Sequence, residues 1–370
     1  MREVNLDGQF QKFPSHIMIK KEVVVSGSYP PPYGGIAYVV KSHMDSVLNK
    51  NFNLNLIKKP NIANCNIMTK IYFLLYYYFK FFNKIRETQA QITHIHSSSY
   101  GGFWRYSIAI FVSKLLNSKV VLHIHGARFD DFYTNSVFPI RYTIQQILNS
   151  VDRLIVLTPE WSKFFEKFIK DKSIIKILPN GVDTGKYTTT HKESKNKVLI
   201  HFGCTARKGI NEIVNSLPEI IDDNTRLILV DNVERQSIID KIKEYTDNVD
   251  YFVNVSENEK VKLLSSSDIL ILPTFAEGMP ILILEAMSSG LAIVTTAVGG
   301  IPSVLRNREN CIFAEPGNSE SLQSSISTLK NNQKLMKNMK EANRQKVEKL
   351  YSLGKITDNL ENIYNQLLNQ

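Results

Sequence analysis

Residues 275–287 read Phe275-Ala276-Glu277-Gly278-Met279-Pro280-Ile281-Leu282-Ile283-Leu284-Glu285-Ala286-Met287. The apolar run before them, 268–274, is typical of a buried parallel strand. Pro280 suits the first turn of a helix, where its missing N–H is not needed, and Gly290 suits the end of that helix. We therefore expect Glu277 in a strand-to-helix loop and Glu285 one to two turns into the helix.

The predicted helix start also forms a binding site for an anion. Free N–H groups around Met279, Pro280 and Ile281 would point at such a ligand. A carboxylate beside an anion site is better suited to accept hydrogen bonds from neutral hydroxyls, such as those of a sugar or a ribose. Taken alone, a pair of glutamates at this spacing is usually two surface residues, and that is the alternative.

A Gly-Gly-Ile-Pro run at 299–302 completes a longer motif. Glu-Gly-x-Pro-x-x-x-x-Glu-Ala-Met followed by that run resembles the motif of the large retaining glycosyltransferase family four. The resemblance implies the GT-B fold, an α/β arrangement of two facing Rossmann-like domains with a cleft between them. It also implies that Glu277 is catalytic and lies by the donor sugar, and that Glu285 holds the nucleotide ribose. Ser303 stands where many relatives have Glu, and we expect this to affect local packing more than chemistry.

Strands alternate with helices twice along the chain, as expected for two doubly wound domains. Apolar runs predict strands at 22–27, 92–96, 119–125, 153–158, 174–178, 198–203, 226–230, 249–253, 268–274 and 292–295. The polar stretch 184–197 is the predicted linker. We expect an N-terminal, acceptor-side Rossmann-like domain over 1–184 and a C-terminal, nucleotide-sugar-binding one over 185–352. The resemblance implies that a last helix, 353–370, joins the N-terminal domain.

A glycine turn follows the first predicted strand of the second domain, in the run Gly203-Cys204-Thr205-Ala206-Arg207-Lys208-Gly209. Such a turn lets the backbone approach a phosphate, which Arg207 and Lys208 would neutralise. Lys208-Gly209 matches the Lys-Gly of the family. Cys204 stands at the usual Arg position in a loop about one residue shorter, and we expect Arg207 to substitute. The alternative is a basic helix start in a solvent loop.

Three further positions match the family. Gly34 and Gly35 follow a proline-rich loop and precede a predicted helix over 36–48; in relatives this turn faces the donor diphosphate, and a tight structural turn is the alternative. His125 ends a predicted strand, where open α/β sheets bind ligands, and matches the active-site His that touches the donor sugar. Asn180 belongs to a Pro-Asn-Gly-Val-Asp run that matches the hinge side of the donor site, although Asn-Gly is also a common turn.

Four histidines lie on two neighbouring predicted strands. Alternation places His123 and His125 on one face, and His94 and His96 repeat the arrangement. Such a set could hold a metal, but a zinc site needs a settled ligand set with hydrogen-bonded partners behind it, and nothing in the sequence demands one. We therefore expect no metal and no other cofactor. Loss of activity in EDTA, restored by a divalent ion, would support the metal alternative.

Composition excludes several classes of protein. The chain has 370 residues and a net charge of +10, but no Lys/Arg-rich run accompanies a nucleic-acid motif, so we expect no nucleic-acid partner. Its cysteines, Cys65, Cys204 and Cys311, are too few and too scattered for a disulfide framework, which fits a reducing cytosol. Residues 1–7 show no apolar signal region, and no stretch reaches the roughly 20 apolar residues that span a bilayer.

Residues 71–84 are unusually aromatic and read Ile71-Tyr72-Phe73-Leu74-Leu75-Tyr76-Tyr77-Tyr78-Phe79-Lys80-Phe81-Phe82-Asn83-Lys84. Aromatic residues with flanking lysines fit a helix that lies in a membrane interface. A buried core helix is the equally supported alternative. In the interfacial case we expect Tyr77, Phe81 and Phe82 to face the membrane, and the protein to be cytoplasmic and peripheral at the inner face.

Together these features predict a retaining, hexosyltransferase-like glycosyltransferase. It would move a sugar from a nucleotide diphosphate sugar to an acceptor hydroxyl in polysaccharide or glycolipid synthesis. The expected partners are a nucleotide-sugar donor, a saccharide or lipid-linked saccharide acceptor, and an anionic membrane surface. Two alternatives stay open: a sugar-nucleotide epimerase of the same fold, and a catalytically inactive nucleotide-sugar or membrane-binding protein. The sequence does not specify the nucleotide, the sugar, the acceptor, the linkage or the oligomeric state.

Overall fold

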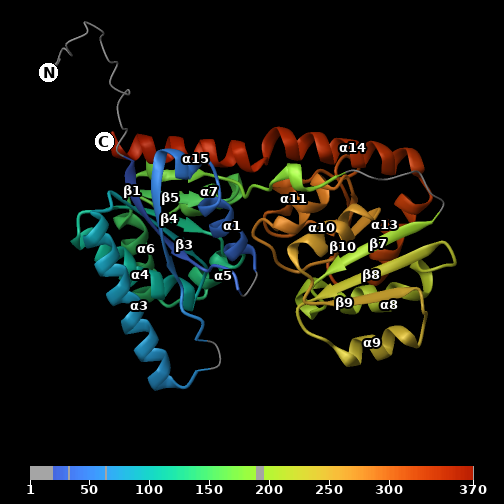
Figure 1. The fold of residues 1–370 in the computed structure, drawn as a ribbon. Coiled ribbons are helices and arrows are strands. Elements are labelled where there is room, and N and C mark those ends of the chain that lie inside the picture. The colour runs from blue at the N-terminus through green and yellow to red at the C-terminus, as the bar shows by residue number, and fades with distance from the viewer. Residues whose placement is uncertain (1–19, 32–33, 63–64, 189–195, 370) are drawn as a thin grey trace, which may run out of the picture.

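The computed structural model describes residues 20–31, 34–62, 65–188 and 196–369. It has two lobes side by side, each built on a six-stranded sheet, with two long helices running along one side of both (Figure 1). The N-terminal segment 1–7 and most of the second half of the predicted linker lie outside the described residues.

All strands of the first sheet run parallel, in the order β2-β1-β3-β4-β5-β6. Their bounds are β1 Lys21–Gly27, β2 Phe52–Lys58, β3 Ile92–Ser97, β4 Lys119–Ile124, β5 Arg153–Val156 and β6 Ile175–Ile177. The helices of this lobe are α1 Gly35–Met44, α2 Leu48–Asn51, α3 Ile67–Thr88, α4 Gly101–Leu115, α5 Phe129–Thr134, α6 Phe138–Ser150 and α7 Pro159–Phe165. The central strands are buried on both faces, which explains their continuous apolar sequence.

The second sheet is also parallel, in the order β12-β11-β10-β7-β8-β9. Its strands are β7 Lys197–Phe202, β8 Thr225–Asp231, β9 Val249–Val253, β10 Ile269–Leu272, β11 Ala292–Thr296 and β12 Ile312–Ala314. Its helices are α8 Ile210–Ile220, α9 Gln236–Lys243, α10 Glu257–Ser265, α11 Ile281–Ser288, α12 Ile301–Val304 and α13 Ser319–Lys330, with a 3₁₀ turn at Ala206–Lys208.

The strand order of the second sheet reverses between β7 and β10. From β7 the chain adds β8 and β9 on one side, and from β10 it adds β11 and β12 on the other. Ligands of open α/β sheets bind outside the carboxyl ends of the strands at such a reversal. The loops that meet there are 203–209, which follows β7, and 273–280, which follows β10.

The two long helices connect the lobes. Val347 of α14 (Gln333–Leu350) packs in a core cluster of the second lobe, whereas Ile356 and Leu360 of α15 (Leu353–Leu368) pack against β1 and β3 of the first (Figure 1). The chain therefore crosses between the lobes twice. The crossings lie side by side, because Val182 N–H donates to the carbonyl of Tyr351 at 2.9 Å and the Val182 carbonyl accepts from Leu353 N–H at 2.8 Å.

One expected element needs correction, and two strands were not predicted. The helix predicted over 36–48 ends at Met44, because the chain turns at Asp45 and Ser46 before the short helix α2 begins. Strand β2 was not predicted, since its sequence alternates apolar residues with asparagine. It is the edge strand of its sheet, where Asn53 and Asn55 donate to the carboxylate of Glu22. The short edge strand β12 was also missed.

Candidate active site

The two lobes together enclose a cavity of about 410 Å³, a size typical of small-molecule sites. The first lobe contributes the start of α1, and the second contributes the loops at the strand reversal together with parts of α10 and α11. Nine of the residues predicted for the site line this cavity: Gly34, Gly35, Gly203, Arg207, Lys208, Glu277, Pro280, Ile281 and Glu285. His125, Asn180 and Met279 do not line it.

The Gly-Gly run of the motif fixes the loop that carries Glu277. A Cβ on Gly299, whose φ is +55°, would come within 1.8 Å of the Glu277 carbonyl oxygen. A Cβ on Gly300 would come equally close to the carbonyl of Gly278, and Gly300 N–H donates to the Glu277 carbonyl at 3.1 Å. Only glycine allows this approach of the two loops, which explains why the run belongs to the motif.

Both cations of the 203–209 loop lie at Glu277. Lys208 Nζ donates to Glu277 Oε1, and Thr274 Oγ1 donates to the same oxygen at 3.3 Å. Arg207 Nη1 donates to the carbonyl of Ala276 at 2.8 Å and lies 3.8 Å from Glu277 Oε1. Arg207 is more exposed than Lys208. The shorter loop therefore still brings an arginine to the cleft, from a different sequence position.

Glu285 is deeply buried, with 2% of its surface exposed. Its Oε1 accepts hydrogen bonds from Tyr187 Oη at 3.2 Å and from Lys260 Nζ. The same ammonium lies 5.6 Å from the ring centroid of Tyr38, which comes from the first lobe. Burial and then the charge of Glu285 raise the pKa of Tyr38 and of Tyr187. Both phenols therefore stay protonated and can donate hydrogen bonds.

The start of α11 faces the cavity through Pro280 and Ile281. Two of the three predicted residues that do not line the cavity lie behind it. Asn180 is buried, and its Nδ2 donates to the carbonyl of Met279 at 2.8 Å while its backbone N–H points at Met279 Sδ at 3.3 Å. Asn180 and Met279 therefore hold the helix start against the segment that connects the lobes.

His125 lies where the backbones of the two lobes touch. Its carbonyl oxygen is 3.0 Å from the place where a Cβ on Gly278 would lie, so the glycine of the Glu-Gly pair lets the lobes approach. The ring Nε2 of His125 is 2.9 Å from His96 Nδ1. Burial lowers the pKa of His125 to about 3, so its imidazole is neutral at physiological pH.

Tyr38, Tyr187 and Lys260 were not predicted as site residues. Tyr38 was read only as part of a helix, Tyr187 falls within the predicted linker, and Lys260 belongs to a polar helix typical of a solvated surface. The one usable signal is the Ser256–Glu259 capping box, which predicts where α10 begins and therefore which end of it faces the strand reversal.

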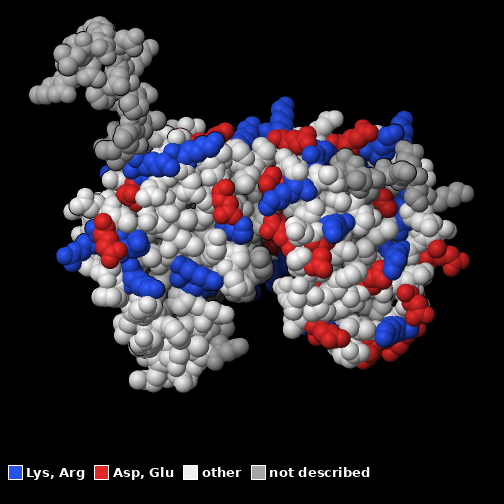
Figure 2. Space-filling view, viewed as in Figure 1, with Lys and Arg blue, Asp and Glu red and all other residues white. Residues whose placement is uncertain are grey.

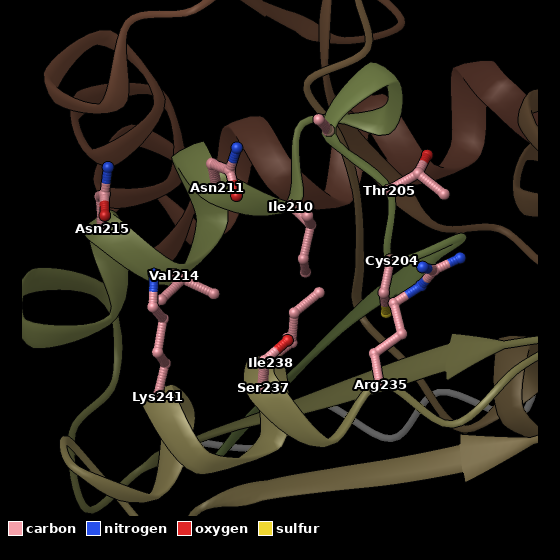
Figure 3. A pocket seen from close by; sticks show the side chains of 11 residues that line it. Cys204, Thr205, Ile210, Asn211, Val214, Asn215, Arg235, Ser237, Ile238 and Lys241 are labelled. Carbon is pink, nitrogen blue, oxygen red and sulfur yellow. The ribbon is translucent and has the colours of Figure 1, made fainter.

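A second cavity, of about 630 Å³, lies between α8 and α9 (Figure 3). It is larger than the cleft, but its lining contains no carboxylate, and its charged residues are Arg235 and Lys241. The Arg235 guanidinium is paired with Asp231 at 2.6 Å. The chemistry that the motif residues can perform therefore belongs to the cleft and not to this cavity.

Comparisons with known proteins place the chain among glycosyltransferases. Residues 37–186 match the sequence model described as Glycosyltransferase Family 4, and residues 186–346 match the one described as Glycosyl transferases group 1. An uncharacterized glycosyltransferase of Methanocaldococcus jannaschii is 22% identical over 95% of this chain and 99% of its own length. The UDP-Gal:alpha-D-GlcNAc-diphosphoundecaprenol alpha-1,3-galactosyltransferase of Escherichia coli is 22% identical over 90% of this chain and 94% of its own.

A solved structure shows the same fold. Sucrose-phosphate synthase from Thermosynechococcus elongatus superimposes with a TM-score of 0.79 at 14% identity, over 95% of this chain and all of that one. The predicted arrangement of two facing Rossmann-like sheets, the GT-B fold, is therefore confirmed.

Proposed function

The chain belongs to glycosyltransferase family four, and from that premise we propose that it transfers a sugar, with retention, from a nucleotide diphosphate sugar to an acceptor hydroxyl. The observation that carries this proposal is the composition of the cleft. A glycine turn of the first lobe faces three cations and four carboxylates of the second, all lining one cavity, namely Arg207, Lys208, Lys260, Asp231, Glu257, Glu277 and Glu285. Such a set can bind a diphosphate and the hydroxyls on either side of it.

The cations and helix starts bind the diphosphate. Lys208 and Arg207 supply two positive charges, and α1 and α11 direct free N–H groups into the cavity. Negative charge grows on the diphosphate as the bond to the sugar breaks, so groups already held in place there stabilise the transition state. These groups are sufficient for this task without a metal ion.

Glu285 binds the ribose. A buried carboxylate with free lone pairs accepts hydrogen bonds from vicinal hydroxyls, and the Tyr187 hydroxyl holds it in place. Lys260 Nζ donates to Oε1 of Glu285. When the ribose hydroxyls bind this carboxylate, the Lys260 ammonium moves away from it, toward the cavity or the diphosphate.

Glu277 lies at the sugar. When the diphosphate draws Lys208 away, the Glu277 carboxylate is free to accept from sugar hydroxyls and to support positive charge on the sugar. His125 contacts the sugar from the first lobe, and closure of the lobes excludes water. No side chain is assigned as general base, because the leaving phosphate itself can take the proton of the acceptor.

We propose that the acceptor is a saccharide carried on a membrane lipid. One full-length relative is named for a diphosphoundecaprenol-linked acceptor. Along α3 the exposed face carries large apolar side chains, namely Ile67, Met68, Ile71, Tyr72, Phe73, Leu75, Tyr76 and Phe79. The projecting end of this helix shows almost no charge on the visible face (Figures 1 and 2). Among the described helices, none is both long and apolar enough to cross a bilayer.

The orientation of α3 corrects one expectation. Tyr77 and Phe81 are 3% and 0% exposed and pack in the core of the first lobe, so they do not face a membrane. The helix combines both earlier alternatives, since one side belongs to the core and the other is apolar and exposed. We propose that the exposed side lies in the interface of an anionic membrane at the cytoplasmic face, with Lys70 and Lys80 beside it.

A panel of donors tests the proposal. Thermal shifts with uridine, guanosine, adenosine and thymidine diphosphates identify the nucleotide, because a ligand of the folded state raises its melting temperature. The matching radiolabelled sugar donors are then incubated with polyprenyl-diphosphate-linked saccharides. Labelled lipid-linked product with retained anomeric configuration supports the proposal. Conversion of the free donor into an epimer, or nucleotide binding without any turnover on a broad acceptor panel, contradicts it.

A further inference from the structure

Five histidine rings form one cluster in the first lobe, and four of these residues are buried. His43 comes from α1, His94 and His96 from β3, and His123 and His125 from the end of β4. Neighbouring ring centroids are 4.0 Å apart for His123 and His125, 4.2 Å for His94 and His96, and 5.0 Å for His96 and His123. His43 was not among the histidines found from the sequence; its ring lies 5.6 Å from that of His96.

Half of the ten ring nitrogens of this cluster are buried and have no hydrogen-bond partner among the described residues. The unpaired buried atoms are His43 Nδ1, His94 Nε2, His96 Nε2, His123 Nδ1 and His123 Nε2. A buried polar atom without a partner costs about 1–3 kcal/mol. Five such atoms in one place indicate that the cluster surrounds a ligand that the nitrogens can bind in common.

Two of the imidazoles are oriented as metal ligands are. His94 Nδ1 is 2.6 Å from the hydroxyl of Tyr364 on α15, and His96 Nδ1 is 2.9 Å from His125 Nε2. Each ring is thus held through one nitrogen, while its other nitrogen is buried and free. Metal-binding histidines have this arrangement, in which a partner behind the ligand fixes the ring and its tautomer.

Ring nitrogens of three of these histidines also lie close enough to one another to share one ion. His43, His94 and His96 each offer a ring nitrogen, and these atoms lie within 4.8 Å of one another. Bonds of about 2.0–2.1 Å to a tetrahedral ion place ligand nitrogens about 3.3 Å apart. Binding of an ion therefore requires the rings to rotate, so that nitrogens now up to 4.8 Å apart approach this separation.

The chemistry of the donor set selects the kind of ion. All donors are imidazoles, which suit zinc, nickel, cobalt and copper, whereas magnesium and calcium require oxygen ligands. Three imidazoles alone hold zinc in known enzymes, so no carboxylate is required.

We propose that His43, His94 and His96 bind one divalent first-row transition cation, with His123 as a fourth imidazole beside them. This site does not rest on the proposed transfer reaction. It connects to the predicted active-site histidine through the hydrogen bond between His96 and His125. The bound ion fixes the ring of His96 and, through it, the tautomer and direction of His125.

The test uses the full chain without a polyhistidine tag, which would itself bind the probe. Cobalt(II) is titrated into the apoprotein, and visible absorption reports its coordination by nitrogen ligands. Zinc is then added in competition. We expect one cobalt ion per chain, with absorption bands of a low-symmetry nitrogen site that zinc removes. Absence of saturable cobalt binding by the wild-type chain would overturn the proposal.

Two matched tyrosine variants locate the ion. Tyr364→Phe removes only the hydroxyl behind His94 and is expected to weaken cobalt binding about 10–100-fold. Tyr77→Phe removes a comparable buried hydroxyl, which bonds Ser26 at 2.6 Å, and is expected to leave the affinity unchanged. Equal cobalt affinities of the two variants would overturn the assignment of His94 as a ligand.

Histidine variants complete the test. His94→Gln and His43→Gln are expected to abolish the absorption bands, whereas His201→Gln is expected to retain them, because His201 lies on β7 of the second lobe, where its ring nitrogens are 2.9 Å and 3.1 Å from the carbonyls of Ile271 and Gly203. Circular dichroism establishes which variants are folded. A folded His94→Gln protein that binds cobalt like the wild type would contradict the proposed ligand set. If the histidine variants do not fold, the comparison of Tyr364→Phe with Tyr77→Phe still tests where the ion binds.

Discussion

Lys260 Nζ donates a hydrogen bond to Glu285 Oε1, and this contact joins two separate helices, because Lys260 lies on α10 and Glu285 on α11. The side chain of Glu285 is 3% exposed and that of Lys260 is 21% exposed, so the charges meet largely out of water. Lys208 forms the corresponding ion pair with Glu277. Each of the two motif glutamates thus has its own lysine, and a buried negative charge is tolerated in both positions because a positive charge accompanies it.

The Lys260–Glu285 pair predicts a stability effect. Lys260→Met should lower the free energy of unfolding by about 3 kcal/mol, because a buried carboxylate then lacks its counter-charge. Lys260→Met combined with Glu285→Gln should recover most of that loss, since neither charge remains. Urea unfolding of the wild type, both single variants and the double variant gives the coupling energy. Independent, additive effects would show that the pair is not coupled.

The two glutamates should differ in function. Glu277→Gln keeps the shape of the side chain but removes its charge, so transfer should fall about 100-fold or more while nucleotide affinity changes little. Glu285→Ala should instead weaken nucleotide binding, because the ribose loses its acceptor. Turnover with saturating donor and calorimetric nucleotide titration separate the two effects. Near-normal turnover of Glu277→Gln would contradict the assigned roles.

The basic loop offers a comparison of two cations. Lys208→Ala should cost about 2–4 kcal/mol of transition-state stabilisation, measured as a loss in kcat/KM, because its ammonium is largely buried in the cleft. Arg207→Ala should cost less, since that guanidinium is more than half exposed and screened by water. A larger effect at Arg207 than at Lys208 would mean that Arg207 makes the main contact with the diphosphate.

The sequence predicted the sheets well and the surroundings of the site poorly, for a physical reason. Parallel strands buried on both faces, such as β4 and β10, are short apolar runs that stand out locally. The position of Glu277 follows from the strand before it and the proline after it. Strand β2, by contrast, lies at a sheet edge, and its asparagines conceal the pattern.

Some residues reach the histidine cluster or the cleft from helices that are distant in sequence. The sequence around these residues has no local pattern that predicts their position. His43 and Lys260 lie on α1 and α10, whose own sequences do not indicate which face meets β3 or α11. That choice is made by packing between segments tens of residues apart. Likewise, the sequence of α3 contains two apolar sides, and only its contact with the core distinguishes the buried Tyr77 from the exposed Tyr76.

Transfer should not require magnesium or manganese. Lys208 and Arg207, which line the cleft, are the proposed contacts of the diphosphate, and the predicted absence of a metal at this step can be tested directly. Chelator-treated enzyme should give the same kcat/KM, within about twofold, with and without added magnesium. A strict requirement for magnesium would contradict the proposed role of the basic loop. Imidazoles bind magnesium poorly, so the histidine site does not interfere with this comparison.

The last prediction concerns the exposed side of α3. Tyr72, Leu75 and Phe79 are each more than 60% exposed, and the Lys80 ammonium lies 4.8 Å from the centroid of the Tyr76 ring. If this side lies among lipid headgroups, the protein should co-sediment with vesicles that contain anionic lipid, and less so at high salt, where the attraction of the lysines is screened.

Substitutions on the two sides of the helix separate membrane contact from folding. Changing Tyr72, Leu75 and Phe79 to Ser should release the protein from vesicles and leave its melting temperature nearly unchanged, because these side chains make little contact with the core. The matched change Phe81→Ser should lower the melting temperature strongly, since Phe81 is fully buried. Transfer to a lipid-linked acceptor should fall in the triple variant, while transfer to a short water-soluble acceptor should persist. If the wild type ignores anionic vesicles, the exposed side has another partner, and membrane recruitment is not how this enzyme meets its acceptor.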